Sequence, residues 1–144
     1  MQTSAVDAEQ LITSLGLAAH PEGGHFVETW RSGELAGTRA TATAILFLLR
    51  NGERSHWHRV DADELWMFHA GDPLRVRVAA ADAPVETSTL GIDLAGGHRP
   101  QVVVPAGRWQ AAESLGRFTL VSCVVSPGFE FAGFELAPPG WEPS

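Results

Sequence analysis

The chain is predicted to be an all-β domain, an antiparallel sandwich or barrel, preceded by one short helix. From residue 25 onward, short apolar runs alternate with Gly, Pro and Asp, and many short strands at such spacing are typical of this class. The jelly roll is its double-sheet version. The 144 residues correspond to one domain, and a hydrophobic content of 44% is ordinary for a globular protein with its own core.

Residues 7–17 are predicted to form the helix. Its apolar positions repeat at about 3.6 residues, and they are Leu11, Ile12, Leu15 and Leu17. Asp7 can cap the first turn, and Gly16 and the sequence His20-Pro21-Glu22-Gly23-Gly24 end the helix. Because its glycines allow positive φ and a close backbone approach, segment 20–24 is either a lip over a pocket or only the connection to the sheet.

The remaining chain is predicted to contain ten strands and a loose tail. The strands are expected at 25–31, 41–49, 55–60, 64–70, 74–80, 85–90, 101–104, 109–112, 117–125 and 129–136. The tail, residues 138–144, is rich in proline and cannot continue a strand, so we expect it to be unattached.

Charge and hydropathy exclude several classes of partner. The net charge is −7, and the ten basic residues are all arginines spread along the chain. Without a basic stripe to neutralise phosphates, binding of nucleic acid is not expected. No apolar run is long enough to span a membrane, and the N-terminus lacks a secretory signal, so the cytoplasm is the expected compartment.

Three residue types limit the chemistry. Cys123 is the only cysteine, so no internal disulfide forms, and its apolar strand makes it a buried small hydrophobe rather than a nucleophile. The absence of lysine excludes Schiff-base chemistry through a lysine. The absence of tyrosine excludes a phenolic general acid.

Histidine and glutamate side chains are predicted to converge near the middle of the chain. His56 and His58 stand two residues apart in a predicted strand and are expected to share a face, because side chains alternate in a strand. Glu64 follows at the start of the next apolar run. Such a cluster serves a metal ion or acid–base chemistry. The alternative is that Glu64 lies solvated at the strand end.

Aromatic residues flank two carboxylates. Phe26, Glu28 and Trp30 are expected on one face of strand 25–31, and Glu64, Trp66 and Phe68 on one face of strand 64–70. Glu28 is either a second acid–base group or an edge glutamate packed on its neighbours. The aromatics either line a pocket or belong to the core.

Two motifs carry a resemblance to a known family. The first contains Gly52, His56-Trp57-His58, Glu64 and Gly71, and the second is Pro105-Ala106-Gly107-Arg108-Trp109-Gln110. They resemble the two motifs of the cupin superfamily, whose second motif ends in a metal-binding histidine where this chain has Gln110. With segments 20–24, 28–32, 44–49 and 126–129, the chain looks like the branch of small, stand-alone cupins of unknown function.

The resemblance implies a double-stranded β-helix, the cupin jelly roll, over about 25–136 of a single domain 1–144. It also implies a homodimer with a fold similar to sugar-nucleotide epimerases, and a divalent metal held by His56, His58, Glu64 and Gln110. Since an amide oxygen is a weaker ligand than imidazole, this set is expected to bind metal less tightly than three histidines.

Three functions compete. The first is an isomerase or epimerase acting on a sugar, sugar nucleotide or keto compound, with His58 as base or metal ligand, Glu64 as its partner and Glu28 as a second acid–base group. The epimerases use a tyrosine acid that this chain lacks, so another acid is needed. The second is a non-catalytic binder of a small molecule, with a pocket lined by Phe26, Trp30, Trp66 and Phe68. The third is a metal-dependent oxygenase or lyase.

Overall fold

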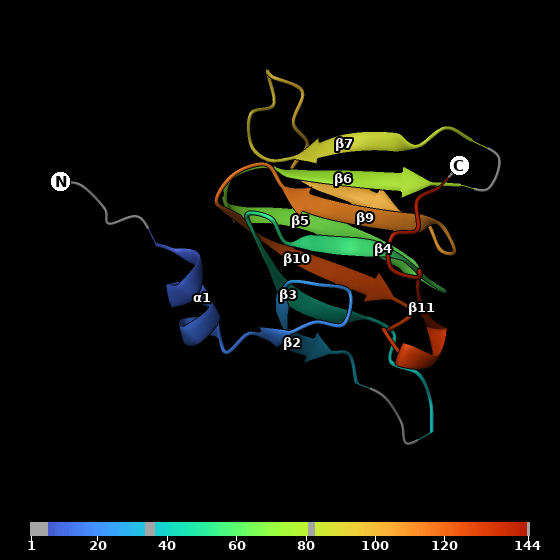
Figure 1. Ribbon diagram of the computed structural model, residues 1–144. Helices are drawn as coiled ribbons and strands as arrows, with labels where there is room; N and C mark the ends of the chain where they lie inside the picture. Colours follow the sequence, from blue (N-terminus) through green and yellow to red (C-terminus); the bar gives the residue numbers. More distant parts are fainter. Residues whose placement is uncertain (1–5, 34–36, 81–82, 144) are drawn as a thin grey trace.

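Two antiparallel sheets pack face to face in the computed structural model, which describes residues 6–33, 37–80 and 83–143 (Figure 1). One sheet has the strand order β1-β2-β3-β10-β5-β8, and the other has the order β11-β4-β9-β6-β7. Apart from β1-β2-β3 and β6-β7, neighbouring strands are distant in sequence, as in a double-stranded β-helix. The predicted all-β jelly-roll class is confirmed.

The six-stranded sheet contains β1 (Ala18–Ala19), β2 (His25–Arg31), β3 (Thr43–Arg50), β10 (Phe118–Ser126), β5 (Asp63–Gly71) and β8 (Gln101–Val104). The five-stranded sheet contains β11 (Phe134–Leu136), β4 (Arg54–Val60), β9 (Trp109–Ser114), β6 (Leu74–Ala79) and β7 (Glu86–Leu90). The expected strands agree with these bounds to within a few residues, except for segment 129–136.

The helix α1 (Ala8–Leu15) begins at a capping box in which Asp7 and Gln10 bond each other's backbone N–H groups. It ends at Gly16, whose φ of 68° is left-handed. Its apolar face packs on Leu48 and Leu120 of the six-stranded sheet. Arg50, the last residue of β3, reaches Glu9 at 2.6 Å and links the helix to the end of this strand.

The main core fills the space between the sheets. Its buried members are Phe47, Leu49, Trp66, Leu74, Val76, Leu90, Val104, Ala112, Val121 and Cys123. Phe26 and Phe68 pack against this cluster, and Trp66 is fully buried in it. Glu64, Trp66 and Phe68 point inward from β5, but the two aromatics serve the core.

Segment 129–136 corrects one prediction. Only Phe134–Leu136 is a strand, because Phe131–Gly133 forms a 3-10 turn. Its phenylalanines pack against one another instead of alternating, with ring centroids 5.0 Å apart for Phe129 and Phe131 and 6.0 Å for Phe131 and Phe134. The turn therefore gathers aromatic rings at one end of the sandwich.

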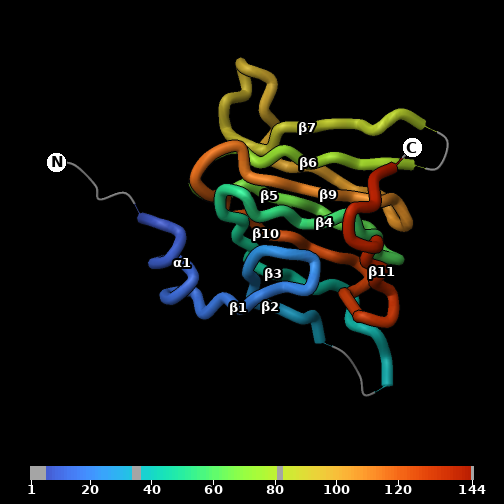
Figure 2. Tube along the Cα trace, viewed as in Figure 1, coloured from blue at the N-terminus to red at the C-terminus, as the bar shows by residue number. Residues whose placement is uncertain are grey.

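The prediction of an unattached C-terminal tail is also wrong, because residues 137–142 are attached to the five-stranded sheet. The tail runs beside β4 and β9 (Figure 2). Trp141 stacks on Trp109 at 4.7 Å, and the Trp57 indole N–H donates to Glu142 at 3.0 Å. An aromatic face on the outside of the five-stranded sheet thus retains the tail; Ser144 of the predicted tail lies outside the described residues.

In the described parts of the chain, no helix is long and apolar enough to cross a membrane.

Candidate functional site

A β-bulge in β4 decides which histidine enters the interior. Opposite β9, Ser55 pairs with Ala112 and His58 with Gln110, so β4 contains one extra residue between these pairs. Ser55 and His58 consequently both point inward. His56 points outward, and its Nε2 lies 2.9 Å from the carbonyl oxygen of Pro138. The expectation that His56 and His58 share a face is therefore wrong.

A second bulge, in β2, decides which of the side chains near Glu28 face the interior. Glu28 pairs with Ile45 and Trp30 with Ala44, which leaves one extra residue in β2. Phe26, Glu28 and Arg31 then face the interior, whereas Trp30 is 52% exposed. The predicted face of Phe26, Glu28 and Trp30 is thus broken after Glu28.

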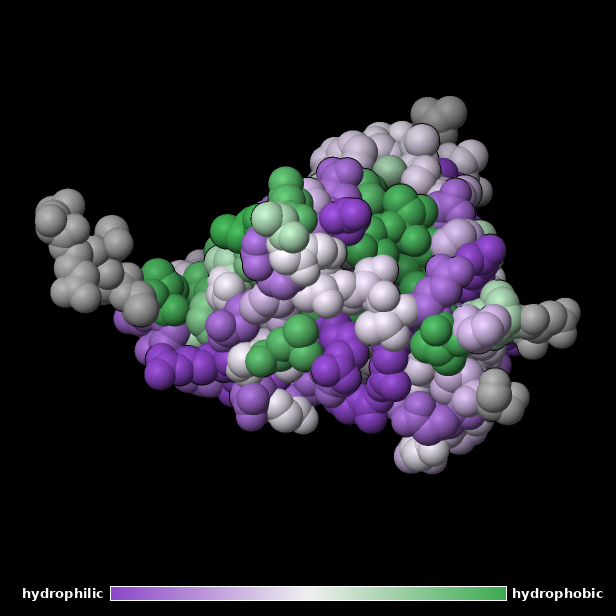
Figure 3. Space-filling model, turned by 90° about the horizontal axis from the view of Figure 1, so that it is seen from above, coloured by the Kyte–Doolittle hydropathy of each residue, from purple (hydrophilic) through white to green (hydrophobic). Residues whose placement is uncertain are grey.

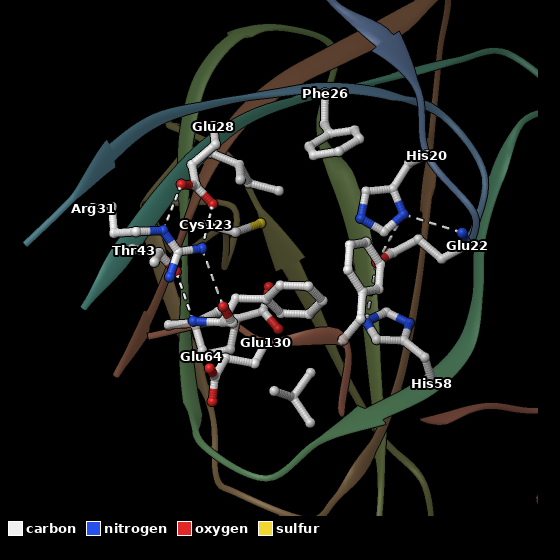
Figure 4. Close-up of a pocket in the computed structure, with 15 residues that line it drawn as sticks. His20, Glu22, Phe26, Glu28, Arg31, Thr43, His58, Glu64, Cys123 and Glu130 are labelled. Atoms are coloured by element: carbon white, nitrogen blue, oxygen red, sulfur yellow. Dashed lines mark hydrogen bonds and ion pairs between the residues drawn. The ribbon is translucent and has the colours of Figure 1, made fainter. Parts of the chain in front are cut away.

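The side chains turned inward surround a cavity of about 240 Å³ near the end of the sandwich (Figure 4). It is lined by His20, Glu22, Phe26, Glu28, Arg31, Thr43, Ile45, His58, Val60, Glu64, Cys123, Val125, Phe129, Glu130 and Phe131. The polar groups come from several strands and from the turn before β2. The walls between them are apolar.

Glu22 reaches the cavity because its turn lies directly against β4. Gly23 has a φ of 112°, and a Cβ there would lie 1.9 Å from the carbonyl oxygen of Arg54. Only glycine permits this approach. The contact is extended by the bond from the His56 N–H to the Glu22 carbonyl at 2.8 Å. Segment 20–24 is therefore a wall of the cavity as well as a connection.

Glu22 lies between two histidines at the cavity floor. Its Oε1 is 3.5 Å from His20 Nδ1 and 3.6 Å from His58 Nε2. The Ser55 hydroxyl donates to Oε2, so a proton on Glu22 belongs on Oε1, facing the imidazoles. Burial raises the pKa of Glu22 to about 8, which keeps this carboxyl protonated at neutral pH.

Both histidines are held as neutral imidazoles. His58 Nδ1 lies 2.7 Å from the His56 carbonyl oxygen, so it carries the proton and leaves Nε2 as the acceptor. Burial lowers the pKa of His58. His20 Nδ1 accepts the Glu22 N–H at 3.1 Å, and burial, aided by the neighbouring His58, lowers its pKa to about 4. Each ring therefore has one acceptor and one donor nitrogen, and backbone groups already occupy the donor of His58 and the acceptor of His20.

Glu64 is positioned from the opposite sheet by Gln110. The Trp66 indole N–H donates to Gln110 Oε1 at 2.8 Å, and Gln110 Nε2 donates to Glu64 Oε1 at 2.9 Å. Because an indole nitrogen is only a donor, this order fixes the amide orientation. Burial raises the pKa of Glu64 to about 7, and the buried thiol of Cys123 also bonds this carboxyl. Glu64 is buried rather than solvated.

The rim of the cavity carries ion pairs. Arg31 Nε and Nη2 contact the two oxygens of Glu28 at 2.9 and 3.0 Å, and Nη2 also lies 3.3 Å from the Phe129 carbonyl oxygen. Glu130 is 3.5 Å from Arg39. The rim thus pairs each arginine with a carboxylate.

The described residues do not fit a metal ion bound by the expected set. Gln110 directs its amide N–H, not its oxygen, toward Glu64, and His56 points away from the cavity. Nowhere in residues 6–33, 37–80 and 83–143 do three or more His, Cys, Asp or Glu side chains form a group able to hold a metal. The four predicted ligands are therefore not brought together.

Of the residues predicted to act, the cavity brings together His58, Glu64 and Glu28, with Phe26 in its wall. Trp66 and Phe68 lie behind it in the core, and Trp30 lies outside. The interpretation of the sequence missed His20 and Glu22 as floor residues. The signal was the motif His20-Pro21-Glu22-Gly23-Gly24, whose two glycines indicated a close approach.

A double-stranded β-helix with polar side chains in its open end defines the class as a cupin. The chain matches the family model described as Cupin superfamily (DUF985) over residues 9–137. It belongs to this family. No curated protein matches the chain.

Solved structures agree. A Shewanella oneidensis protein is 42% identical with a TM-score of 0.88, covering 92% of this chain and 85% of its own. A hypothetical protein from Leishmania major is 33% identical with a TM-score of 0.85, covering 92% and 88%. Oxalate decarboxylase from Bacillus subtilis, for which Mn(II) centers are described, shares only the fold, with 15% identity, a TM-score of 0.64 and coverage of 82% of this chain and 29% of its own.

Proposed function

We propose that the chain is an enzyme of the isomerase or epimerase type, which moves a proton beside the carbonyl group of a small polar compound. The observation that carries the proposal is the apposition of His58 Nε2, an unprotonated acceptor, and the protonated Glu22 carboxyl in one buried cavity. A base and an acid with separated pKa values are what such a reaction requires.

In the proposed step, His58 Nε2 takes a proton from the carbon next to the carbonyl. The electron pair of the C–H bond forms a carbon–carbon double bond, and the carbonyl oxygen accepts the proton of Glu22 or Glu64 to give an enol. Return of a proton to the same carbon from the opposite face, with the enol O–H proton passing back to the carboxylate, inverts that carbon. If that carbon bears a hydroxyl group, return of the proton to the former carbonyl carbon, with the hydroxyl proton passing to the carboxylate, moves the carbonyl group by one carbon. Burial supports this step because it raises the pKa of Glu22 to about 8, so that Glu22 keeps its proton at neutral pH, and the pKa of Glu64 to about 7, so that about half of Glu64 is protonated there.

The test is hydrogen exchange in D₂O, followed by proton NMR of keto sugars, aldo sugars and sugar nucleotides. With the natural chain, we expect the NMR signal of the C–H group beside the carbonyl to disappear as deuterium replaces hydrogen. In His58→Ala, we expect the rate of this exchange to be about 10²–10⁴-fold lower. His69→Ala is the matched control, since His69 is exposed on the outer face. Exchange that survives in His58→Ala at the natural rate rejects His58 as the base.

A non-catalytic binding role is the second candidate, and the apolar walls favour it. Phe26, Ile45, Val60, Val125 and Phe129 form most of the cavity surface between the polar groups. Such a pocket binds a small molecule without needing a reactive base. Tight binding of a compound that shows no exchange and no turnover would support this role over the first.

We also propose that the chain pairs with a second copy of itself. Ile92 and Leu94, in the loop after β7, and Val103, on the edge strand β8, are large apolar side chains with most of their surface exposed. Apolar areas interrupt the hydrophilic surface seen from above (Figure 3). Edge strands and exposed apolar residues are common features of interfaces between copies.

A further inference from the structure

We infer that the ligand of this cavity is an uncharged carbonyl or polyhydroxy compound of about monosaccharide size, and not its phosphorylated or nucleotide-linked form. The inference deepens the proposed function, because it names the chemical class that the same cavity accepts. It rests on three properties of the cavity: its volume, its charges and its pattern of donors and acceptors.

The volume limits the ligand. Pockets for drug-sized molecules measure about 300–1,000 Å³, and this cavity measures about 240 Å³. A nucleotide joined to a sugar exceeds that space. A single sugar ring or a short open-chain sugar fits it.

The charges disfavour an anion. The charged side chains of the lining are the carboxylates of Glu28 and Glu130 and the single guanidinium of Arg31, because burial raises the pKa of Glu22 to about 8 and that of Glu64 to about 7. That guanidinium already binds both oxygens of Glu28. A phosphoryl group would have to displace Glu28 and then lie close to the Glu130 carboxylate, and both changes oppose its binding.

The floor and walls match hydroxyl and carbonyl groups. His58 Nε2 is an acceptor, whereas the Glu22 carboxyl is a donor through Oε1. Hydroxyl groups use both kinds of partner, and a carbonyl oxygen uses the donor. Phe26, Phe129 and Phe131 line the sides and offer apolar surface to the C–H faces of a sugar.

The experiment compares matched probes that differ only by a phosphate. D-ribulose and D-ribulose 5-phosphate, with D-fructose and D-fructose 6-phosphate as a second pair, are titrated into the full chain and followed by ligand-observed NMR and calorimetry. We expect the free sugar of a pair to bind at least about tenfold more tightly than its phosphate, a ratio equivalent to about 1.4 kcal/mol. UDP-glucose is expected not to enter.

Two variants sharpen the comparison. Glu28→Gln releases Arg31 from its carboxylate and is expected to shift the affinity ratio toward the phosphorylated probes by about tenfold. Glu86→Gln, an exposed glutamate on β7, is the matched control and should leave the ratio unchanged. A ratio that responds equally to both substitutions contradicts a role for the rim.

The outcomes separate this inference from the proposed function. Tighter binding of the phosphates, or no binding of either free sugar, overturns the ligand class. Binding of free sugars without hydrogen exchange supports the ligand class and rejects the proposed acid–base reaction. Exchange confined to the phosphorylated probes supports the reaction and rejects the ligand class.

Discussion

At the scale of single residues, the cavity depends on hydrogen bonds that fix the positions of protons. His58 on β4 and Gln110 on β9 are paired residues. One polar atom of each side chain is hydrogen-bonded to a group that can act only as acceptor or only as donor. The His56 carbonyl can only accept, and the Trp66 indole can only donate. These two neighbours therefore determine which atoms His58 and Gln110 present to Glu22 and Glu64.

The Gln110 amide is expected to stabilise the charged form of Glu64. Gln110→Leu removes the donor, so the pKa of Glu64 should rise further, by about one unit. Trp66→Phe should raise it by less, because the amide remains but is no longer oriented. The measurement is carboxyl ¹³C NMR of glutamate-labelled protein over pH. An unchanged Glu64 midpoint in a folded Gln110→Leu variant would show that the amide is only structural.

Glu22 is expected to make stability fall as pH rises above neutral. Its pKa is raised to about 8 in the folded chain, against about 4.5 when unfolded, so the folded state alone retains the proton between these values. Stability is therefore fully present below the unfolded pKa and is lost as pH passes through the folded one. Between pH 6.5 and 8.5 each such group contributes up to about 1.4 kcal/mol per pH unit.

The measurement is urea unfolding of the natural chain and Glu22→Gln at these two pH values. The natural chain should lose more stability than the variant, which retains only the contribution of Glu64, whose pKa is about 7. The window begins at the unfolded pKa of His20 and His58, about 6.5, so their lowered folded pKa values oppose the loss only at its acidic end, and they do so in both chains. Equal losses in the two chains would contradict a buried, protonated Glu22.

At the scale of elements, the bulges and the attached tail place the site. The extra residue in β4 turns His58 inward, and the extra residue in β2 turns Arg31 inward. The tail lies over the outer face of β4, where its oxygen atoms form hydrogen bonds with the side chains of His56 and Trp57. The strand that carries His58 is thus held from both sides.

Trp141 is expected to contribute to stability although it stands almost at the end of the chain. Trp141→Ala removes its packing on Trp109 and Trp57 and should lower the free energy of unfolding by about 1–2 kcal/mol. Thermal and urea unfolding measure the change. Trp30→Ala is the control, because Trp30 is about half exposed. A loose tail would make the two substitutions equally small in effect.

At the scale of the whole molecule, the two sheets build a cavity that neither builds alone. Glu64 comes from the six-stranded sheet, His58 and Gln110 from the five-stranded sheet, and Glu22 from the turn that precedes β2. The cavity opens at the end where the 3-10 turn gathers its phenylalanines. The Gly23 contact with β4 joins these parts.

Pairing of two copies is tested by light scattering after size-exclusion chromatography. The natural chain is expected to elute with twice the mass of the 15.4 kDa chain. Val103→Arg places a charge on the edge strand and should shift the equilibrium to the monomer. The control is Glu86→Arg at the start of β7, the end of this strand that lies away from the loop with Ile92 and Leu94. A monomer at high protein concentration rejects the proposed pair.

Much of the fold was predictable from local patterns. Apolar alternation and turn residues indicated nearly all the strands, the capping residue and Gly16 bounded the helix, and two motifs indicated the family. Glu64, His58 and Glu28 were also predictable as cavity residues, because polar groups within apolar strands require buried partners.

Only the tertiary structure decided which neighbours of these residues share the cavity. The face of a side chain in a strand follows a period of two, and one inserted residue reverses it for every residue beyond the insertion. Such a bulge depends on pairing with β9 or β3, which local sequence does not reveal. It therefore excluded His56 and Trp30, admitted Arg31, and left Glu22 and His20 to be found where the glycine turn meets β4.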